Sequence, residues 1–136
     1  MANKDVLSRF YDEINAGNTD VIEDLIAEDV VERHPLAPSP DREVVRQFFT
    51  MVRAGFPDMQ FRILHIVGED DLVISHGLIE GTHEGEFIGI APTHRRVSVP
   101  FTDVVRIRNG RMVEHWGVTD TGAMMEQLGA APARAG

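Results

Sequence analysis

Hydrophobic residues recur at helical spacing in three stretches of the first half of the chain. The first stretch follows Asn3, a possible cap, and stops at Gly17, and the second begins after Asn18. Ser39 and Pro40 supply a cap and a first helical residue for the third. The pattern predicts three helices. Their buried stripes would contain Val6, Leu7, Phe10, Tyr11 and Ile14 in the first helix, Val21, Ile22, Leu25 and Ile26 in the second, and Val44, Val45, Phe48, Phe49 and Val52 in the third.

Strand patterns dominate the second half of the chain. Asn109-Gly110 separates two of these strands and is the strongest short hairpin signal, because both central residues of a type I′ turn need positive φ. A short helix is expected after the last strand, at 122–128. The predicted strands are a short one at 30–35, between the second and third helices, and four longer ones at 59–67, 72–82, 97–108 and 111–120.

This order of elements predicts an α+β fold in which three N-terminal helices pack on one face of a strongly curved, mainly antiparallel sheet. Such a sheet forms a cone whose interior can stay open as a pocket. We expect one domain over residues 1–129 and a flexible tail at 130–136. Strand 72–82 carries apolar residues in both of its alternating phases, so the outer face of the sheet is expected to pack against a second subunit in a homodimer.

Length and composition restrict the chemistry. With 136 residues the chain has room for one core but not for a separate cofactor domain. No apolar run approaches the roughly 20 residues of a membrane span, and the first residues lack the apolar stretch of a signal peptide. We therefore expect a cytoplasmic protein that does not bind membranes.

Charge and motif content narrow the possible partners. A net charge of -9 disfavours nucleic acid, which needs clustered Lys and Arg. The chain has no cysteine, and its histidines lack metal-binding spacing, so no metal site is expected. The glycines at 81, 85 and 89 form neither a phosphate loop nor a dinucleotide fingerprint, and bends over the cavity mouth are expected there instead. No cofactor is predicted.

Two long segments carry a family resemblance. They run from Gly81-Thr-His-Glu-Gly to Thr-His-Arg-Arg-Val97, and from Arg106-Ile-Arg-Asn-Gly to Glu-His-Trp-Gly-Val-Thr-Asp120. Together with Glu32-Arg33-His34-Pro35 and Gln127-Leu-Gly, they resemble the SnoaL-like polyketide cyclase and ester cyclase family, within the nuclear-transport-factor-2-like superfamily of cone-shaped α+β barrels.

The resemblance implies a cofactor-free, aldol-type ring closure. A pocket carboxylate at the end of the last strand would act as acid and base, and the surrounding pocket would hold the enolate. By position, Asp120 matches that carboxylate.

Strand alternation links other residues to Asp120. Glu114, Trp116 and Asp120 would share one strand face, so a Trp116 that faces the cavity would bring both carboxylates with it. A carboxylate among apolar walls is desolvated, which suits acid and base catalysis. The alternatives are that Asp120 caps the C-terminal helix and that Glu114 pairs with an arginine.

Two further candidates lie elsewhere in the predicted sheet. Folding back at Asn109-Gly110 pairs positions whose numbers sum to about 219, which sets Asp103 opposite Trp116 as an acid and aromatic pair. The alternative for Asp103 is a salt bridge to a nearby arginine, Arg106 or Arg108. His34, at the end of the first strand, could move protons at the pocket entrance or be a structural residue.

The expected ligand-binding side chains are Trp116, Tyr11, Phe48 and Met112. Tyr11 could donate its hydroxyl to an enolate, or it could be a core residue with its hydroxyl at a polar rim. Together with these residues, the resemblance implies a cyclase or isomerase that acts on a small, largely apolar, enolisable carbonyl compound. The alternative is a non-catalytic, dimeric module that binds a small molecule, although Asp103, Glu114 and Asp120 are more acids than such a cavity needs.

Overall fold

A computed structural model describes residues 2–33 and 42–129 of the chain. It contains α1 (Asn3–Asn15), α2 (Val21–Leu25), β1 (Ile26–Glu32), α3 (Arg42–Gly55), β2 (Gln60–Glu69), β3 (Leu72–Thr82), β4 (Arg96–Arg108), β5 (Arg111–Thr119) and α4 (Thr121–Leu128). The segment at 34–41, which includes the expected cap Ser39 and the candidate His34, and the expected tail at 130–136 lie outside the described residues.

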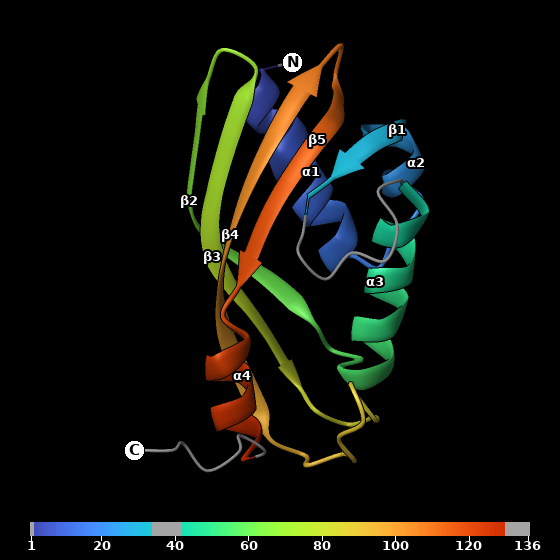
Figure 1. Ribbon diagram of the computed structural model, residues 1–136, viewed down its shortest axis with the longest axis vertical. Coiled ribbons are helices and arrows are strands. Elements are labelled where there is room, and N and C mark those ends of the chain that lie inside the picture. Colours follow the sequence, from blue (N-terminus) through green and yellow to red (C-terminus); the bar gives the residue numbers. More distant parts are fainter. Residues whose placement is uncertain (1, 34–41, 130–136) are drawn as a thin grey trace.

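The five strands form one sheet in the order β1-β5-β4-β3-β2. β1 runs parallel to β5, and the other neighbouring strands are antiparallel. The long strands bend across the molecule, and α1 and α3 lie on the concave side (Figure 1). The sheet does not close into a full barrel, so helices supply the remaining wall of the core. This is the α+β cone architecture that the sequence predicted.

The predicted periodicities hold for most elements. All five residues of the expected α1 stripe are buried, and β3 has the predicted bounds. The turn between β4 and β5 places Asn109 at φ 53° and Gly110 at φ 74°, as a type I′ hairpin requires. The predicted start of the first strand is too late in the chain, because β1 begins at Ile26, where the chain leaves α2 directly in extended conformation.

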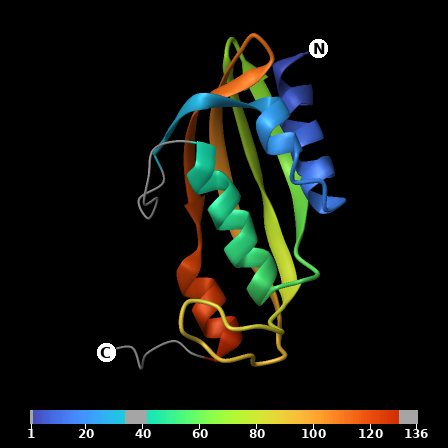
Figure 2. The ribbon, with the colours of Figure 1, turned by 90° about the vertical axis from the view of Figure 1, so that its right-hand side faces the viewer.

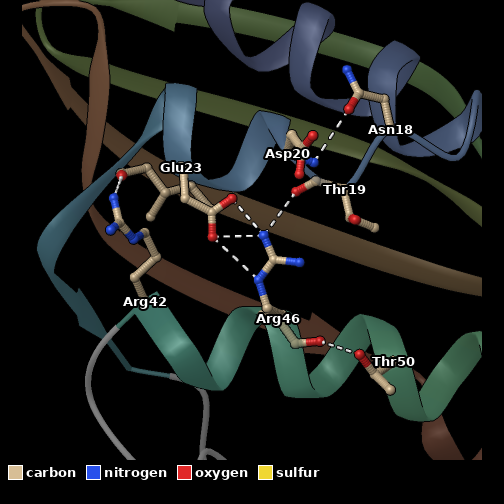
Figure 3. A network of polar contacts seen from close by, with 8 residues as sticks. Asn18, Thr19, Asp20, Glu23, Arg42, Arg46 and Thr50 are labelled. Carbon is tan, nitrogen blue, oxygen red and sulfur yellow. Dashed lines mark hydrogen bonds and ion pairs between the residues drawn. The ribbon is translucent and has the colours of Figure 1, made fainter.

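Two arginines of α3 bind that helix to α2 and to the start of β1. Arg46 donates to the carboxylate of Glu23, with Nη2 to Oε1 at 2.6 Å, and to the Thr19 carbonyl at 3.5 Å. Arg42 donates to the Ile26 carbonyl at 3.2 Å (Figure 3). These contacts tie α3 to α2 and to the start of β1. Because α3 covers the concave face of the sheet (Figure 2), they also fix the cover of the core.

The connection from β3 to β4 closes the lower end of the molecule beside α3 and α4 (Figure 2). Gly85 donates its backbone N–H to the Gly55 carbonyl at 3.1 Å, and a Cβ at Gly85 would lie only 2.1 Å from the Ala54 oxygen. Glycine is therefore required where this connection touches the end of α3. His83 is fully buried within it and accepts the Thr93 backbone N–H at Nδ1, at 3.1 Å.

The outer face of the sheet carries exposed apolar side chains. Val67 and Ile74 are cross-strand partners and are 59% and 42% exposed, and Val118 of β5 is 69% exposed. Exposed apolar area on a sheet face is costly in water and is typical of surfaces that associate. The homodimer remains a prediction, and these side chains mark the surface through which two copies would pack.

Substituting Val118 by Asp tests this surface. If two copies pack through the outer face, light scattering at micromolar concentration should give twice the chain mass for the unchanged protein. The variant should give the mass of one chain, because a carboxylate buried in an apolar interface is strongly unfavourable. A single-chain mass for the unchanged protein would contradict the prediction.

Candidate active site

A cavity of about 510 Å³ lies between the concave face of the sheet and the helices. Its walls are mainly aliphatic and aromatic side chains of α1, α3 and the strands, including Phe48, Met112 and Tyr11 as predicted. Phe87 and Ile88 of the β3–β4 connection also line it, which fits the expected cover at the cavity mouth. The volume is in the range typical of small-molecule sites.

Polar groups gather at one part of this apolar cavity. Asp103 of β4 accepts the Tyr11 hydroxyl at Oδ2, at 2.6 Å, and lies 2.8 Å from His115 Nε2 through Oδ1. On the other side of the ring, His115 Nδ1 lies 2.7 and 2.8 Å from the two carboxylate oxygens of Glu32. Ser75 Oγ lies 2.6 Å from the Tyr11 hydroxyl oxygen. These residues form one connected network, called here the acid–imidazole network.

The direction of each hydrogen bond follows from the available protons. Tyr11 has a single hydroxyl proton, which it gives to Asp103, so Ser75 donates to Tyr11. Burial, followed by the nearby charge of Asp103, raises the pKa of Tyr11 well above its usual value of 10. The phenol therefore stays protonated and remains a donor at neutral pH.

His115 is charged between its two carboxylates. Burial has the largest single effect and lowers the pKa of His115, but the hydrogen bonds and charges of Asp103 and Glu32 together outweigh it. The net result is a pKa of about 10, raised from 6.5. The imidazolium form has an N–H on each ring nitrogen, so it can donate to both acids at once.

Gly117 provides the space for the contact between His115 and Asp103. It is the Cα partner of Asp103 in the sheet, and a Cβ at this position would lie 2.8 Å from His115 Cε1 and 3.2 Å from Asp103 Oδ1. Real Cβ atoms essentially never lie within 3.0 Å of another heavy atom, so the His115 ring would have to move. A residue other than glycine would push the ring away from the carboxylate.

The predicted pairing of Asp103 with Trp116 is wrong by one residue. Ile107 pairs with Met112 as expected, but Arg106 pairs with Glu114, so Val113 is an extra residue in β5. A shift of one residue reverses the two faces of a strand. Beyond Val113, the cavity-facing residues of β5 are therefore His115, Gly117 and Thr119.

Trp116 and Glu114 share a strand face as predicted, but that face lies outside the cavity lining, so the prediction that Trp116 contacts the ligand is wrong. The Arg33 guanidinium is 6.0 Å from the centre of the Trp116 ring. Arg33 also bonds Glu114, with Nε to Oε2 at 2.6 Å, and Arg106 bonds it at 3.2 Å. These bonds, with that of Arg33 the stronger influence, lower the pKa of Glu114. The arginine pairing left open by the sequence is the one observed.

Asp120 occupies the alternative position that the sequence left open. It precedes α4 as the N-cap, and its Oδ1 accepts the Ala123 backbone N–H at 2.9 Å. It borders a separate hollow at the outer surface, beside His76 and Thr102, and not the large cavity. His34 lies outside the described residues. Of the four predicted acid/base residues, the structure places Asp103 in the cavity.

Glu32 and His115 are the site residues that sequence reasoning missed. In the sequence, Glu32 stands out only as part of the family-like segment, and His115 only as an unpaired histidine. Their contact depends on parallel pairing of β1 with β5, in which Glu32 and His115 are Cα partners.

Among the described residues, no group of three or more His, Cys, Asp or Glu side chains is arranged to hold a metal ion. None of the described helices is long and apolar enough to cross a membrane.

Comparison with known proteins identifies the family. The SnoaL-like polyketide cyclase family model matches residues 5–128, and the chain belongs to this family. IdmH from Streptomyces antibioticus, a proposed polyketide cyclase, has a similar structure, with a TM-score of 0.86 and 34% identity over 95% of this chain and 99% of that one.

AclR from Streptomyces galilaeus, a proposed hydroxylase, gives a TM-score of 0.85 and 26% identity over 96% of this chain and 97% of that one. A SnoaL-like protein from Jannaschia sp. CCS1 shares the fold, with a TM-score of 0.84 and 23% identity over 96% of this chain and 93% of that one. No curated protein matches the sequence significantly.

The charged state of His115 predicts a pH-dependent stability. Because folding raises the pKa of His115 from 6.5 to about 10, this residue stabilises the fold fully below about pH 6.5, and its contribution disappears as the pH rises to about 10. The loss should be on the order of a few kcal/mol. Denaturant unfolding between pH 6 and pH 10 measures it.

His115→Gln should remove most of that decline. His94→Gln is a matched control, because the His94 side chain is 70% exposed and pairs with Glu84 at the surface, and this variant should keep the decline. An equal decline of the free energy of unfolding in the unchanged protein and in His115→Gln would contradict the charged state assigned to His115.

The capping role of Asp120 gives a separate prediction. Asp120→Ala should lower the free energy of unfolding by about 1 kcal/mol, because Ala123 loses its acceptor. Asp120→Asn should be nearly neutral, since asparagine caps almost as well. Thermal unfolding of both variants tests the difference, and equal losses would count against the cap.

Proposed function

We propose that the protein is a cofactor-independent cyclase of the polyketide cyclase type, in which Asp103 is the general acid and base. The observation that carries the proposal is the Asp103 carboxylate itself, which lies in an apolar cavity between the Tyr11 hydroxyl at 2.6 Å and His115 Nε2 at 2.8 Å. A carboxylate held by two donors keeps further lone pairs that can accept a substrate proton.

The proposed reaction is an intramolecular aldol addition. Asp103 removes a proton from the carbon next to a substrate carbonyl, which breaks the C–H bond and leaves an enolate. The enolate carbon then forms a C–C bond with a second carbonyl carbon of the same molecule. The resulting alkoxide takes the proton back from Asp103. The atoms and electrons balance without an oxidant, a reductant or a cofactor.

The rest of the cavity would fold the substrate and exclude water. Aromatic side chains of α3 and the sheet form much of its wall, and a flexible carbon chain bound there would bring its two carbonyl groups together. Tyr11 and His115 keep the base in one orientation. Both effects lower the entropic cost of ring closure.

The charge of the cavity supports an uncharged substrate. The described lining contains the carboxylates of Glu32, Glu80 and Asp103, one imidazolium, and neither lysine nor arginine. A carboxylate or phosphate on the ligand would meet like charges in a low-dielectric space. Ketones, esters and hydroxyl compounds fit this environment better.

The alternative is a binding module that holds a ligand without changing it. Charged groups in an apolar cavity cost free energy, and an inert site for an apolar ligand has no need of two carboxylates around an imidazolium. The acid–imidazole network therefore favours the enzyme over the binding module.

Asp103→Asn tests the proposed role. The change keeps the shape but removes the proton acceptor, so turnover of an enolisable dicarbonyl substrate should fall by about 100-fold or more. Asp71→Asn is the control, because Asp71 pairs with Arg106 outside the cavity lining, and its turnover should be unchanged. Retained activity in Asp103→Asn, or loss in Asp120→Asn alone, would contradict the proposal.

A further inference from the structure

Glu32 lies in the cavity wall against the ring of His115. It is the last residue of β1, and its side chain is only 7% exposed and lines the cavity. Both of its carboxylate oxygens lie within 2.8 Å of one atom, Nδ1 of His115. The opposite ring nitrogen contacts Asp103 at 2.8 Å. Glu32 is therefore connected to the proposed base through a single imidazole ring.

We propose that Glu32 is a positioning residue, which holds His115 in its doubly protonated form and thereby keeps the Asp103 carboxylate fixed in the cavity. The inference rests on the proposed function for the role of Asp103. Glu32 does not need to touch the substrate for this role, because it acts through His115.

The geometry supports a doubly protonated His115, because the two ring nitrogens of a neutral imidazole carry one N–H and one lone pair. With an acid at each ring nitrogen, the neutral ring would point its lone pair at a carboxylate oxygen 2.7 or 2.8 Å away. Only the imidazolium gives each acid a proton. Its pKa of about 10 agrees with this arrangement at neutral pH.

The arrangement also gives a carboxylate among apolar walls a charged partner. Asp103 alone would be poorly solvated in the cavity, and the imidazolium next to it replaces water as a partner. The imidazolium is itself desolvated, and the second carboxylate compensates for that cost.

The simpler alternative is that Glu32 only joins β1 to β5. In that case its loss would weaken the fold or the site equally at every pH. In the positioning role, its loss changes the protonation of His115, so the effect must depend on pH. The other groups that face this ring in the described structure are Asp103 and, through Asp103, the protonated Tyr11 hydroxyl.

Glu32→Gln separates the two roles. NMR of the His115 imidazole in the full, ligand-free chain, with the signal assigned by its loss in His115→Gln, gives the pKa of His115 without any substrate. The pKa should fall by at least about one unit in Glu32→Gln, because the amide carries no charge to hold the second proton. Glu32→Asp keeps the carboxylate charge but places it one methylene further from the ring. The pKa of His115 should therefore fall by less in this variant.

An unchanged pKa of His115 in Glu32→Gln, or a neutral ring in the unchanged protein at pH 7, would overturn the inference. If Glu32→Gln fails to fold, the test rests on the unchanged protein, in which a neutral His115 ring at pH 7 would overturn the inference.

Activity gives a second, independent readout. The ratio of kcat of the unchanged protein to kcat of Glu32→Gln should rise by about tenfold or more as the pH is raised past the lowered pKa of His115. A ratio that does not vary with pH indicates a purely structural role for Glu32 and contradicts the inference. Failure of the proposed function would appear differently, as an active Asp103→Asn variant, and would leave the NMR result unaffected.

Discussion

One extra residue in β5 decides which side chains reach the cavity. Val113 is unpaired between the Ile107–Met112 and Arg106–Glu114 pairs, so the strand continues with its two faces exchanged. Without this bulge, Glu114 and Trp116 would face the core, and His115 would point away from it. With it, His115 meets Asp103 inside, and Gly117 leaves room for their contact.

The acid–imidazole network also requires that β1 is added in parallel to the edge of the antiparallel sheet. That pairing brings Glu32 beside His115, although they are 83 residues apart in the chain. α1 contributes Tyr11 from the opposite wall, and β3 contributes Ser75. Four strands and one helix thus supply a network that none of them contains alone. Its charges are stable in an apolar cavity because each has an opposite charge or a donor within hydrogen-bonding distance.

The sequence predicts those parts of this structure that depend on local patterns. The stripe of α1, the bounds of β3 and the Asn109-Gly110 turn follow from spacing and turn chemistry. The family resemblance extends this to the cone fold, which the sheet topology and the similar structure of IdmH confirm. Asp103 is a candidate because counting back from the turn places it within the sheet beside the last strand, although its predicted partner is wrong by one residue.

The remainder depends on non-local geometry. Counting back from the turn at Asn109 works as far as Met112, but nothing in Met112-Val113-Glu114 marks a bulge, so the predicted face of each later residue is reversed. Glu32 cannot be linked to His115 without knowledge of which strand lies beside β5. A sheet register is a property of two segments together, and sequence patterns describe one segment at a time.

If Asp103 removes a proton from carbon within the cavity, the protein should catalyse the exchange of carbon-bound protons in D₂O. An aromatic or alicyclic 1,3-diketone that fits the cavity is incubated with the protein, and the loss of its α-proton signal is followed by NMR, so that no ring closure is required. We expect exchange that is faster than in buffer, saturates with ligand and is lost in Asp103→Asn. Exchange that is no faster than in buffer, or that is equally fast in the Asp103→Asn variant, would mean that Asp103 is not a carbon base.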